Sequence, residues 1–436
     1  MQNAESRASQ GPLYSYAALR DRDLEVVMIS TKVDVSIVMP CLNEAPSISN
    51  CIANAQAALE ILAREDHLRG EIVFADNSST DGSQAIAREL GARVVHCPKR
   101  GYGEALRCGI NAAVGLLIVI GDSDGQHDFR EAIPMIRKLQ DGFDVCLGSR
   151  FRGQIMPHAM DWKSRYIGTP ILTILFNLLY QSSISDIHCG LRAFTKASFI
   201  RMRPRAASFD FNVEFLTKAT LLHLQLTEVP VTVYSRVQSR TSHLRPWQDG
   251  WADLRYLLML NPWWVFLMPA GVFGVLGLFL SVLFTLLLPG QVGITEPPQI
   301  GLPWVLVGGA LLAVGHQAAL LGLGSLLAGI RNGYRRAGPR LRQVYRLVSL
   351  ENMLLSGAAF LVVGFVIGAW VLERNIGARP VSGADIGGLV AALTCSVIGM
   401  QQMLGGFLFA VIAGNEADLT VALNRQDEVG GDHKSE

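Results

Sequence analysis

Hydrophobic and polar positions divide the chain near residue 260. Before that point, short apolar runs rich in β-branched residues alternate with segments of mixed polarity, whereas afterwards long apolar runs are separated by short polar stretches. Short β-branched runs are typical of buried strands, and apolar runs of about 20 residues are typical of membrane-spanning helices. The pattern therefore predicts an α/β part followed by an all-α membrane part.

The first part alternates between strand and helix. Its apolar runs predict strands at 34–39, 71–76, 92–96 and 115–122. The intervening segments predict helices at 47–66, 78–90 and 101–113. Ser, Thr or Asp near the start of the second helix is expected to act as its N-cap. This alternation indicates a mainly parallel sheet with helices on both faces.

Polar motifs follow three of the predicted strands. They are "PCLNE" at 40–44, "DNSSTDG" at 76–82 and "DSDGQ" at 122–126. Because ligands bind at the carboxyl ends of parallel strands, the motifs are expected to form one site. Asp76 and Asn77 are placed to hydrogen-bond a base or ribose, and Asn43 and Glu44 to do so from the first strand. The segment "KRGYGEAL" adds a basic loop with two glycines.

The third motif predicts a metal site. Asp122, Asp124 and Gln126 supply hard oxygen ligands within five residues. Carboxylates this close together repel one another unless a positive charge lies between them. Mg²⁺ usually takes one or two protein carboxylates and completes its shell with substrate phosphate oxygens. We therefore expect Mg²⁺ or Mn²⁺ here, shared with a diphosphate.

Four apolar stretches are long enough to cross a bilayer as helices. They are 263–288, 302–330, 352–372 and 386–413. His316 and Gln317 lie in the middle of the second stretch, where polar side chains usually face other helices, so interhelical hydrogen bonds are expected. Six arginines lie between the second and third stretches and none between the first and second. That asymmetry predicts that the arginine-rich loop, the α/β part and the C-terminus are all cytosolic.

Two segments are expected to lie in the membrane interface. Residues 158–180 begin basic and aromatic and become strongly apolar, with a bend expected at the Gly-Thr-Pro interruption, and residues 242–261 carry tryptophans and arginines. The expected layout is an N-terminal extension without a signal peptide, a catalytic domain, a juxtamembrane helix, a membrane domain and a tail. Their expected ranges are 1–33, 34–241, 242–261, 262–414 and 415–436.

Composition excludes some functions. The chain has 436 residues, with 38 Lys and Arg against 37 Asp and Glu, so no global positive field points to a nucleic-acid partner. Seven cysteines occur without CxxC spacing. We interpret them as reduced thiols in or near the core, not as a disulfide framework or a zinc site.

Residues 34–240 resemble family 2 glycosyltransferases with the nucleotide-diphospho-sugar (GT-A) fold. The resemblance is to the branch typified by dolichol-phosphate mannose and glucose synthases. It is carried by "VMPCLNEAPSI", "ADNSSTDGS", "KRGYGEAL", "GDSDGQHD", "LGSRF" and "SDIHCGLRAF". It implies transfer of one sugar from a UDP-glucose or GDP-mannose type of donor to a polyprenyl phosphate, undecaprenyl or dolichyl. The implied location is the cytosolic face of the plasma membrane, and a homo-oligomer is left open.

The resemblance also implies roles for individual residues. Pro40, Glu44 and Asp76 would hold the nucleotide, and the acidic motif would hold the metal and diphosphate, with Asp124 and Arg150 as the catalytic pair. Arg150, Arg165 and Thr169 would meet the acceptor phosphate, and Arg236 and Arg240 would belong to a basic loop over the donor. The candidate site residues are therefore Pro40, Asn43, Glu44, Asp76, Asp122, Asp124, Gln126, Arg150, Arg165, Thr169, Arg236 and Arg240. Asn77 departs from the family, whose members often have a second aspartate at this position.

The acceptor chemistry agrees with this interpretation. A phosphate monoester is mostly ionised at pH 7, so it attacks without a general base. His127 and Asp128 flank the acidic motif, but each is equally well explained as part of a turn. One alternative is a processive polysaccharide synthase, although the QxxRW motif of such enzymes is absent from the sequence. Another is a non-catalytic scaffold or lipid-flipping partner, against which the intact acidic motif and Arg150 argue.

Overall fold

A computed structural model describes residues 33–236, 246–287, 301–335, 338–375 and 383–414. The α/β part contains a seven-stranded sheet in the order β3-β2-β1-β4-β6-β5-β7. Its strands are β1 (Val35–Cys41), β2 (Gly70–Asp76), β3 (Arg93–His96), β4 (Leu117–Ile120), β5 (Val145–Ile155), β6 (Arg192–Thr195) and β7 (Leu226–Val233). Every pairing is parallel except those of β6, which runs antiparallel to β4 and β5. The four predicted strands and the mainly parallel sheet are confirmed.

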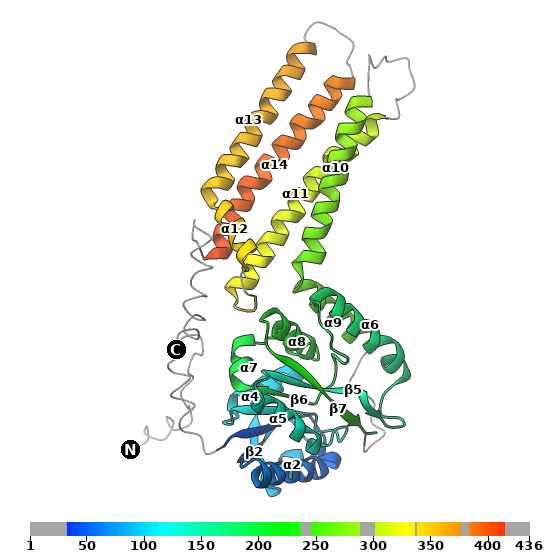
Figure 1. Cartoon of the computed structure of the whole chain (residues 1–436), viewed down its shortest axis with the longest axis vertical. Helices are drawn as coiled ribbons and strands as arrows, with labels where there is room; N and C mark the ends of the chain where they lie inside the picture. Colours follow the sequence, from blue (N-terminus) through cyan, green and yellow to red (C-terminus); the bar gives the residue numbers. More distant parts are fainter. Residues whose placement is uncertain (1–32, 237–245, 288–300, 336–337, 376–382, 415–436) are drawn as a thin grey trace, which may run out of the picture.

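Helices cover both faces of the sheet, as Figure 1 shows. One hydrophobic cluster packs the sheet against α2 (Ala45–Glu65), α3 (Ser83–Glu89) and α5 (Ile133–Gln140). The other packs it against α4 (Tyr102–Ala112), α6 (Thr169–Tyr180), α7 (Lys196–Met202) and α8 (Phe211–Leu221). The expected N-cap of α3 is corrected: Gly82 occupies it with φ of 87°. Asp81 still accepts a hydrogen bond from Ser83 N, and the left-handed backbone explains why glycine stands at position 82.

An exposed apolar face runs along the segment expected at the membrane interface. A π-helical turn, η3 (Ser164–Gly168), ends at the first residue of the Gly-Thr-Pro sequence, and the other two residues begin α6. Large side chains along this segment are 47% to 68% exposed: Ile167, Ile171, Ile174 and Leu178. Exposed isoleucines spaced three or four apart are what a helix lying in a bilayer interface would present. A second helix, α9 (Pro246–Met259), precedes the membrane part.

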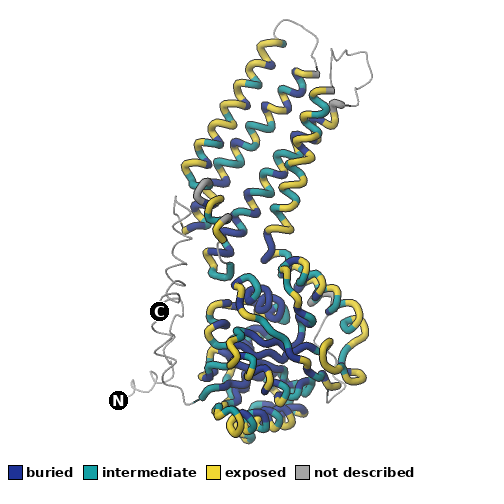
Figure 2. The backbone as a smooth tube through the Cα atoms, viewed as in Figure 1, coloured by how far each residue is buried: buried dark blue, intermediate teal, exposed yellow. Residues whose placement is uncertain are grey.

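Four long apolar helices confirm the predicted membrane part, by length and composition. They are α10 (Met268–Leu287, after the π-turn η4, Trp263–Leu267), α11 (Gly301–Arg331), α13 (Leu350–Asn375) and α14 (Gly383–Ala413). The helix α11 packs between α10 and α14, and α14 packs against α13. Residues coloured as exposed occur along the length of all four helices in Figure 2. As expected, His316 hydrogen-bonds across helices, to Gln401 at 3.0 Å and Gln402 at 2.9 Å. The bond expected for Gln317 is not found within the described parts of the chain.

The arginine-rich loop lies on the same side of the membrane helices as the α/β part. It contains the short helix α12 (Pro339–Leu347). Arg335 donates a hydrogen bond to the Leu260 carbonyl at 3.0 Å, and Lys218 of α8 lies 5.4 Å from the Tyr334 ring centre. This shared side is what the arginine asymmetry predicts. That the shared side is cytosolic stays a prediction.

Candidate active site

The first two motifs interlock at the carboxyl edge of the sheet. Cys41 and Asp76 are register partners in β1 and β2, so their loops emerge side by side. Asn43 Oδ1 accepts a hydrogen bond from Thr80 N at 2.7 Å, and Asn43 N donates to Ser79 Oγ at 3.0 Å. Glu44 N donates to Ser83 Oγ at the start of α3. The sheet therefore brings the predicted nucleotide residues together.

Asp76 is fully buried and holds the loop that follows it. Its oxygens accept hydrogen bonds from Ser78 N at 3.2 Å, Ser79 N at 3.1 Å and Gln84 Nε2 at 2.7 Å. The imidazole of His96 lies 3.5 Å away. The carboxylate thus shapes the turn. That it also hydrogen-bonds the base or ribose of a nucleotide remains a prediction. Pro40 lies on the neighbouring strand β1, and its carbonyl accepts a hydrogen bond from Ser123 Oγ at 2.8 Å.

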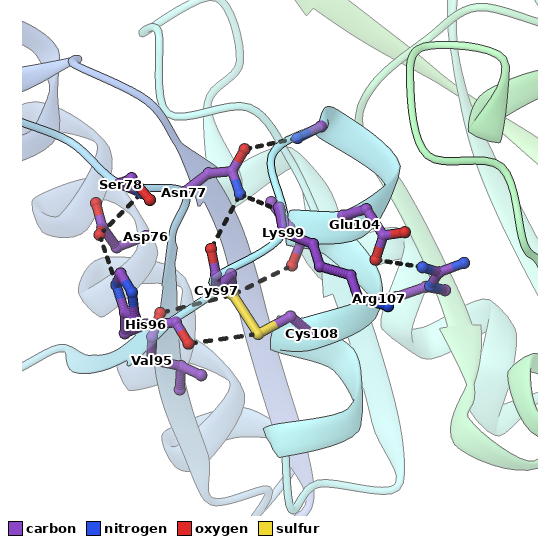
Figure 3. Close-up of a disulfide and its surroundings, with 12 residues drawn as sticks. Asp76, Asn77, Ser78, Val95, His96, Cys97, Lys99, Glu104, Arg107 and Cys108 are labelled. Atoms are coloured by element: carbon purple, nitrogen blue, oxygen red, sulfur yellow. Dashed lines mark hydrogen bonds and ion pairs between the residues drawn. A yellow bond between two sulfur atoms is a disulfide. The ribbon is translucent and has the colours of Figure 1, made fainter.

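Asn77 clamps the basic loop that precedes α4, as Figure 3 shows. Its Nδ2 donates to the carbonyls of Cys97 at 3.2 Å and Lys99 at 2.7 Å, and its Oδ1 accepts from Gly101 N at 2.8 Å. The side chain is buried, so these bonds replace its contacts with water. An aspartate could not donate to either carbonyl. The departure from the family pattern therefore has a structural reason in this chain.

One expectation about the cysteines is wrong. Cys97 and Cys108 form a disulfide with Cα atoms 5.9 Å apart, within the usual range for disulfides. It joins the end of β3 to α4 across the loop that Asn77 clamps, as Figure 3 shows. The pairing arises because the loop turns back on itself, which cysteine spacing alone does not reveal. The other five cysteines are free.

The acidic motif follows β4 at the same edge. Burial and the neighbouring Asp124 carboxylate raise the pKa of Asp122 to about 6. Arg236 Nε donates to Asp124 Oδ2 at 3.0 Å. Gln126 Nε2 donates to the carbonyls of Ala159 at 2.9 Å and Tyr234 at 3.3 Å. The structure thus brings Arg236 to the predicted metal motif, while Arg240 lies outside the described residues.

These residues fit a divalent cation that a substrate helps to bind. Burial and the Asp124 carboxylate disfavour the charged form of Asp122, and a bound cation would favour that form. The amide nitrogen of Gln126 is engaged with backbone carbonyls, which leaves its carbonyl oxygen as the atom suited to a metal. Among the described residues, no group of three His, Cys, Asp or Glu side chains is arranged to hold a metal alone. Two carboxylates supplemented by phosphate oxygens are typical of Mg²⁺ and related ions.

The residues flanking the motif offer no general base. Asp128 caps a short 3₁₀ turn, η2 (Phe129–Ala132), and pairs with Arg130, as its turn-forming interpretation predicts. His127 is 5% exposed, and burial lowers its pKa to about 4. An imidazole with so low a pKa is a weak proton acceptor, so His127 is poorly suited to act as a general base.

A cavity of about 370 Å³ joins the sheet to the interfacial segment. Both predicted acceptor arginines line it, Arg150 from β5 and Arg165 from η3. The remaining lining residues are Phe151, Gly153, Ile155, Tyr166 and Pro170. The structure thus brings two arginines from different elements, β5 and η3, into the lining of one cavity. Thr169 does not line this cavity, because its side chain is buried and its Oγ1 lies 3.4 Å from His188 Nδ1.

The guanidinium of Arg150 is already paired. Its Nε and Nη2 donate to the two oxygens of Asp186 at 2.7 and 2.9 Å. Asp186 is 1% exposed, and although burial opposes it, Arg150 lowers the pKa of this carboxyl. The fork expected to grip a phosphate is therefore occupied by a buried carboxylate. Arg165 is half-buried and stacks on Tyr166 at 5.3 Å.

The sequence patterns did not predict a set of polar contacts that links Arg150 to α9. His188 Nε2 lies 3.0 Å from Asp253 Oδ2 of α9, and His188 N donates to Asp186. Gly190 follows in the same loop, where an added Cβ would come within 2.6 Å of Asp122 Oδ2. The segment "SDIHCGLRAF" therefore connects α9, Arg150 and the acidic motif. The resemblance to the family includes this segment. No pattern in the sequence, however, identified Asp186 or His188 as site residues.

Comparisons with known proteins complete the description of the site. Residues 36–203 match the model for Glycosyl transferase family 2, and residues 323–413 match that for the Glycosyltransferase family 2 C-terminal transmembrane region. The chain is 32% identical to the low-salt glycan biosynthesis hexosyltransferase Agl6 of Haloferax volcanii, over 86% of this chain and 88% of that protein. It is 24% identical to the dolichyl-phosphate hexose transferase of the same organism, over 50% of this chain and 89% of that protein. A solved structure of glucosyl-3-phosphoglycerate synthase from Mycobacterium tuberculosis, in complex with Mn²⁺, UDP and glucosyl-3-phosphoglycerate, aligns with a TM-score of 0.40 at 20% identity, covering 57% and 84% of the two chains.

Proposed function

The chain belongs to glycosyltransferase family 2, and from that membership we propose that it transfers one hexose from a nucleotide sugar to a polyprenyl phosphate on the cytosolic face of the membrane. The family and the membrane helices make it a membrane glycosyltransferase. Two relatives named as hexose-transferring enzymes support a hexose, and the dolichyl-phosphate name of one supports a polyprenyl phosphate acceptor.

The cavity between β5 and η3 carries the acceptor part of this proposal. A polyprenyl phosphate keeps its chain in the bilayer and its phosphate at headgroup depth. The cavity is lined by Arg165 and by Pro170 of α6, the helix whose Ile171 and Ile174 are exposed. An arginine beside an apolar face matches both ends of such a lipid. We assign phosphate contact to Arg165 and treat Arg150 as the residue that Asp186 fixes in the cavity wall.

The transfer needs few protein groups. A phosphate oxygen of the acceptor forms a bond to the anomeric carbon, the bond from that carbon to the donor diphosphate breaks, and the nucleoside diphosphate leaves. The acceptor oxygen is already ionised, so its attack needs no general base. This fits the position of His127 beside the acidic motif, where burial lowers the pKa of the imidazole and makes it a weak proton acceptor. Arg236 and the acidic motif would hold the diphosphate. A divalent cation bound there would stabilise charge on the leaving group.

The proposal is tested with the full chain in membranes. Labelled UDP-glucose, GDP-mannose and other donors are supplied with undecaprenyl or dolichyl phosphate, and lipid-linked sugar is extracted. We expect one donor to label the lipid only when the polyprenyl phosphate is present. Label in a polymer, or no transfer from any donor, would refute the proposal.

Arg165 gives the sharper test of the acceptor site. Arg165→Ala should raise the apparent KM for polyprenyl phosphate about 10- to 100-fold, because a hydrogen-bonded charge contributes about 1.5–3 kcal/mol. The donor KM should stay within about twofold. Lys163→Ala is the matched control, since Lys163 is exposed beside Trp162 and does not line the cavity. An equal rise in the donor and acceptor KM values would contradict the assignment of Arg165 to the acceptor site.

A further inference from the structure

One face of α11 is covered by no other part of the described chain. Val307, Val314 and Leu321 are 41%, 53% and 41% exposed, and Ala310 and Gln317 are exposed between them. These five positions, spaced alternately by three and four residues, form what we call the α11 stripe. Such spacing places side chains along one line of a helix, which is the geometry that packs against a second helix at a small crossing angle.

Gln317 lies deep in the membrane part. It is about 21 and 24 Å from the two ends of α11, at about 1.5 Å per residue. Both distances exceed half of a hydrocarbon core of about 30 Å. Gln317 therefore lies within a hydrocarbon core of about 30 Å wherever that core falls along α11.

The neighbouring polar groups at this depth are paired, whereas Gln317 is not. His316 lies within hydrogen-bond distance of Gln401 and Gln402, and Gln402 Nε2 donates to Ser356 Oγ at 3.4 Å. Within the described parts of the chain, Gln317 has no hydrogen-bond partner. An unpaired amide in hydrocarbon costs several kcal/mol. Lipid chains, including the polyprenyl chain of an acceptor, carry no group that could pair with it.

We propose that the α11 stripe binds the same stripe of a second copy of this chain. Two copies share one orientation in the membrane, so a two-fold axis along the membrane normal places both Gln317 residues at the same depth. Each carboxamide then donates to the carbonyl oxygen of the other, which satisfies both through two reciprocal hydrogen bonds. The valines and the leucine of the stripe pack above and below this pair.

Cysteine cross-linking of the full chain in phospholipid vesicles tests the arrangement. In a Cys395→Ser background, Val314→Cys and Leu321→Cys should each form a covalent dimer on mild oxidation. Phe365→Cys is the matched control, because Phe365 is 76% exposed on α13, outside the stripe. Cross-linking at Phe365 equal to that at the stripe, or none at the stripe, would overturn the proposal.

Substitution of Gln317 tests the role of the amide. Energy transfer between labelled copies, measured as the vesicles are diluted with lipid, reports the dimer dissociation constant. Gln317→Leu should raise this constant about tenfold, and Gln317→Asn should restore part of the loss. Retained hexose transfer in both variants shows that the fold survives. An unchanged constant in Gln317→Leu, or a wild-type chain that stays monomeric at every density, would refute the amide pair.

Discussion

Replacing Asn77 by aspartate, the residue often found in the family, should impair donor binding in this chain. Asn77→Asp keeps the acceptor for Gly101 N but removes the two bonds donated to the carbonyls of Cys97 and Lys99. Each such bond contributes about 1 kcal/mol net. Losing about 2 kcal/mol corresponds to about 30-fold in an equilibrium constant. Because a donor that needs the ordered loop must restore it on binding, the donor KM should rise by up to about 30-fold.

Steady-state kinetics against each substrate measures this effect. The donor KM should rise while kcat and the acceptor KM stay within about twofold of wild type. Asn177→Asp is the matched control, because Asn177 also bridges backbone groups, holding Ile184 on the acceptor side of the fold. It should leave the donor KM unchanged. If Asn77→Asp lowers the thermal midpoint but leaves the donor KM unchanged, the loop does not contact the donor and our reasoning fails.

The remaining predictions concern the metal, the disulfide and the topology. Asp124→Ala should abolish transfer while leaving the protein folded and inserted, and full activity of this variant in EDTA would rule out a metal role. Cys108→Ser should lower the thermal midpoint of the oxidised protein, because a disulfide that closes a short loop contributes about 2–3 kcal/mol to the free energy of unfolding. A thiol reductant should bring the wild type to the same midpoint, and equal midpoints before reduction would show that the bond is not formed. Reporter fusions should read outside, inside and outside at positions 295, 340 and 380, and an inside signal at the first would contradict the topology.

Local patterns in the sequence determined the framework of this protein. The β-branched runs, the polar motifs that end them and the four apolar stretches each depend on residues close together in the chain. They therefore located the first four strands, the carboxyl edge of the sheet and the membrane helices. The acidic motif could be recognised for the same reason, because its carboxylates are only two residues apart.

Only the tertiary structure decided which polar side chains pair with residues that are distant in the sequence. Arg150 is 36 residues from Asp186, and no local pattern shows that a buried carboxylate occupies its fork. Thr169 faces His188 instead of the cavity because α6 rotates it inward against another loop. Cys97 pairs with Cys108, and Asn77 holds their loop, only because the chain folds back after β3. Hydrogen bonds, ion pairs and disulfides act over a few ångströms in space, so their partners are fixed by the packing of distant segments.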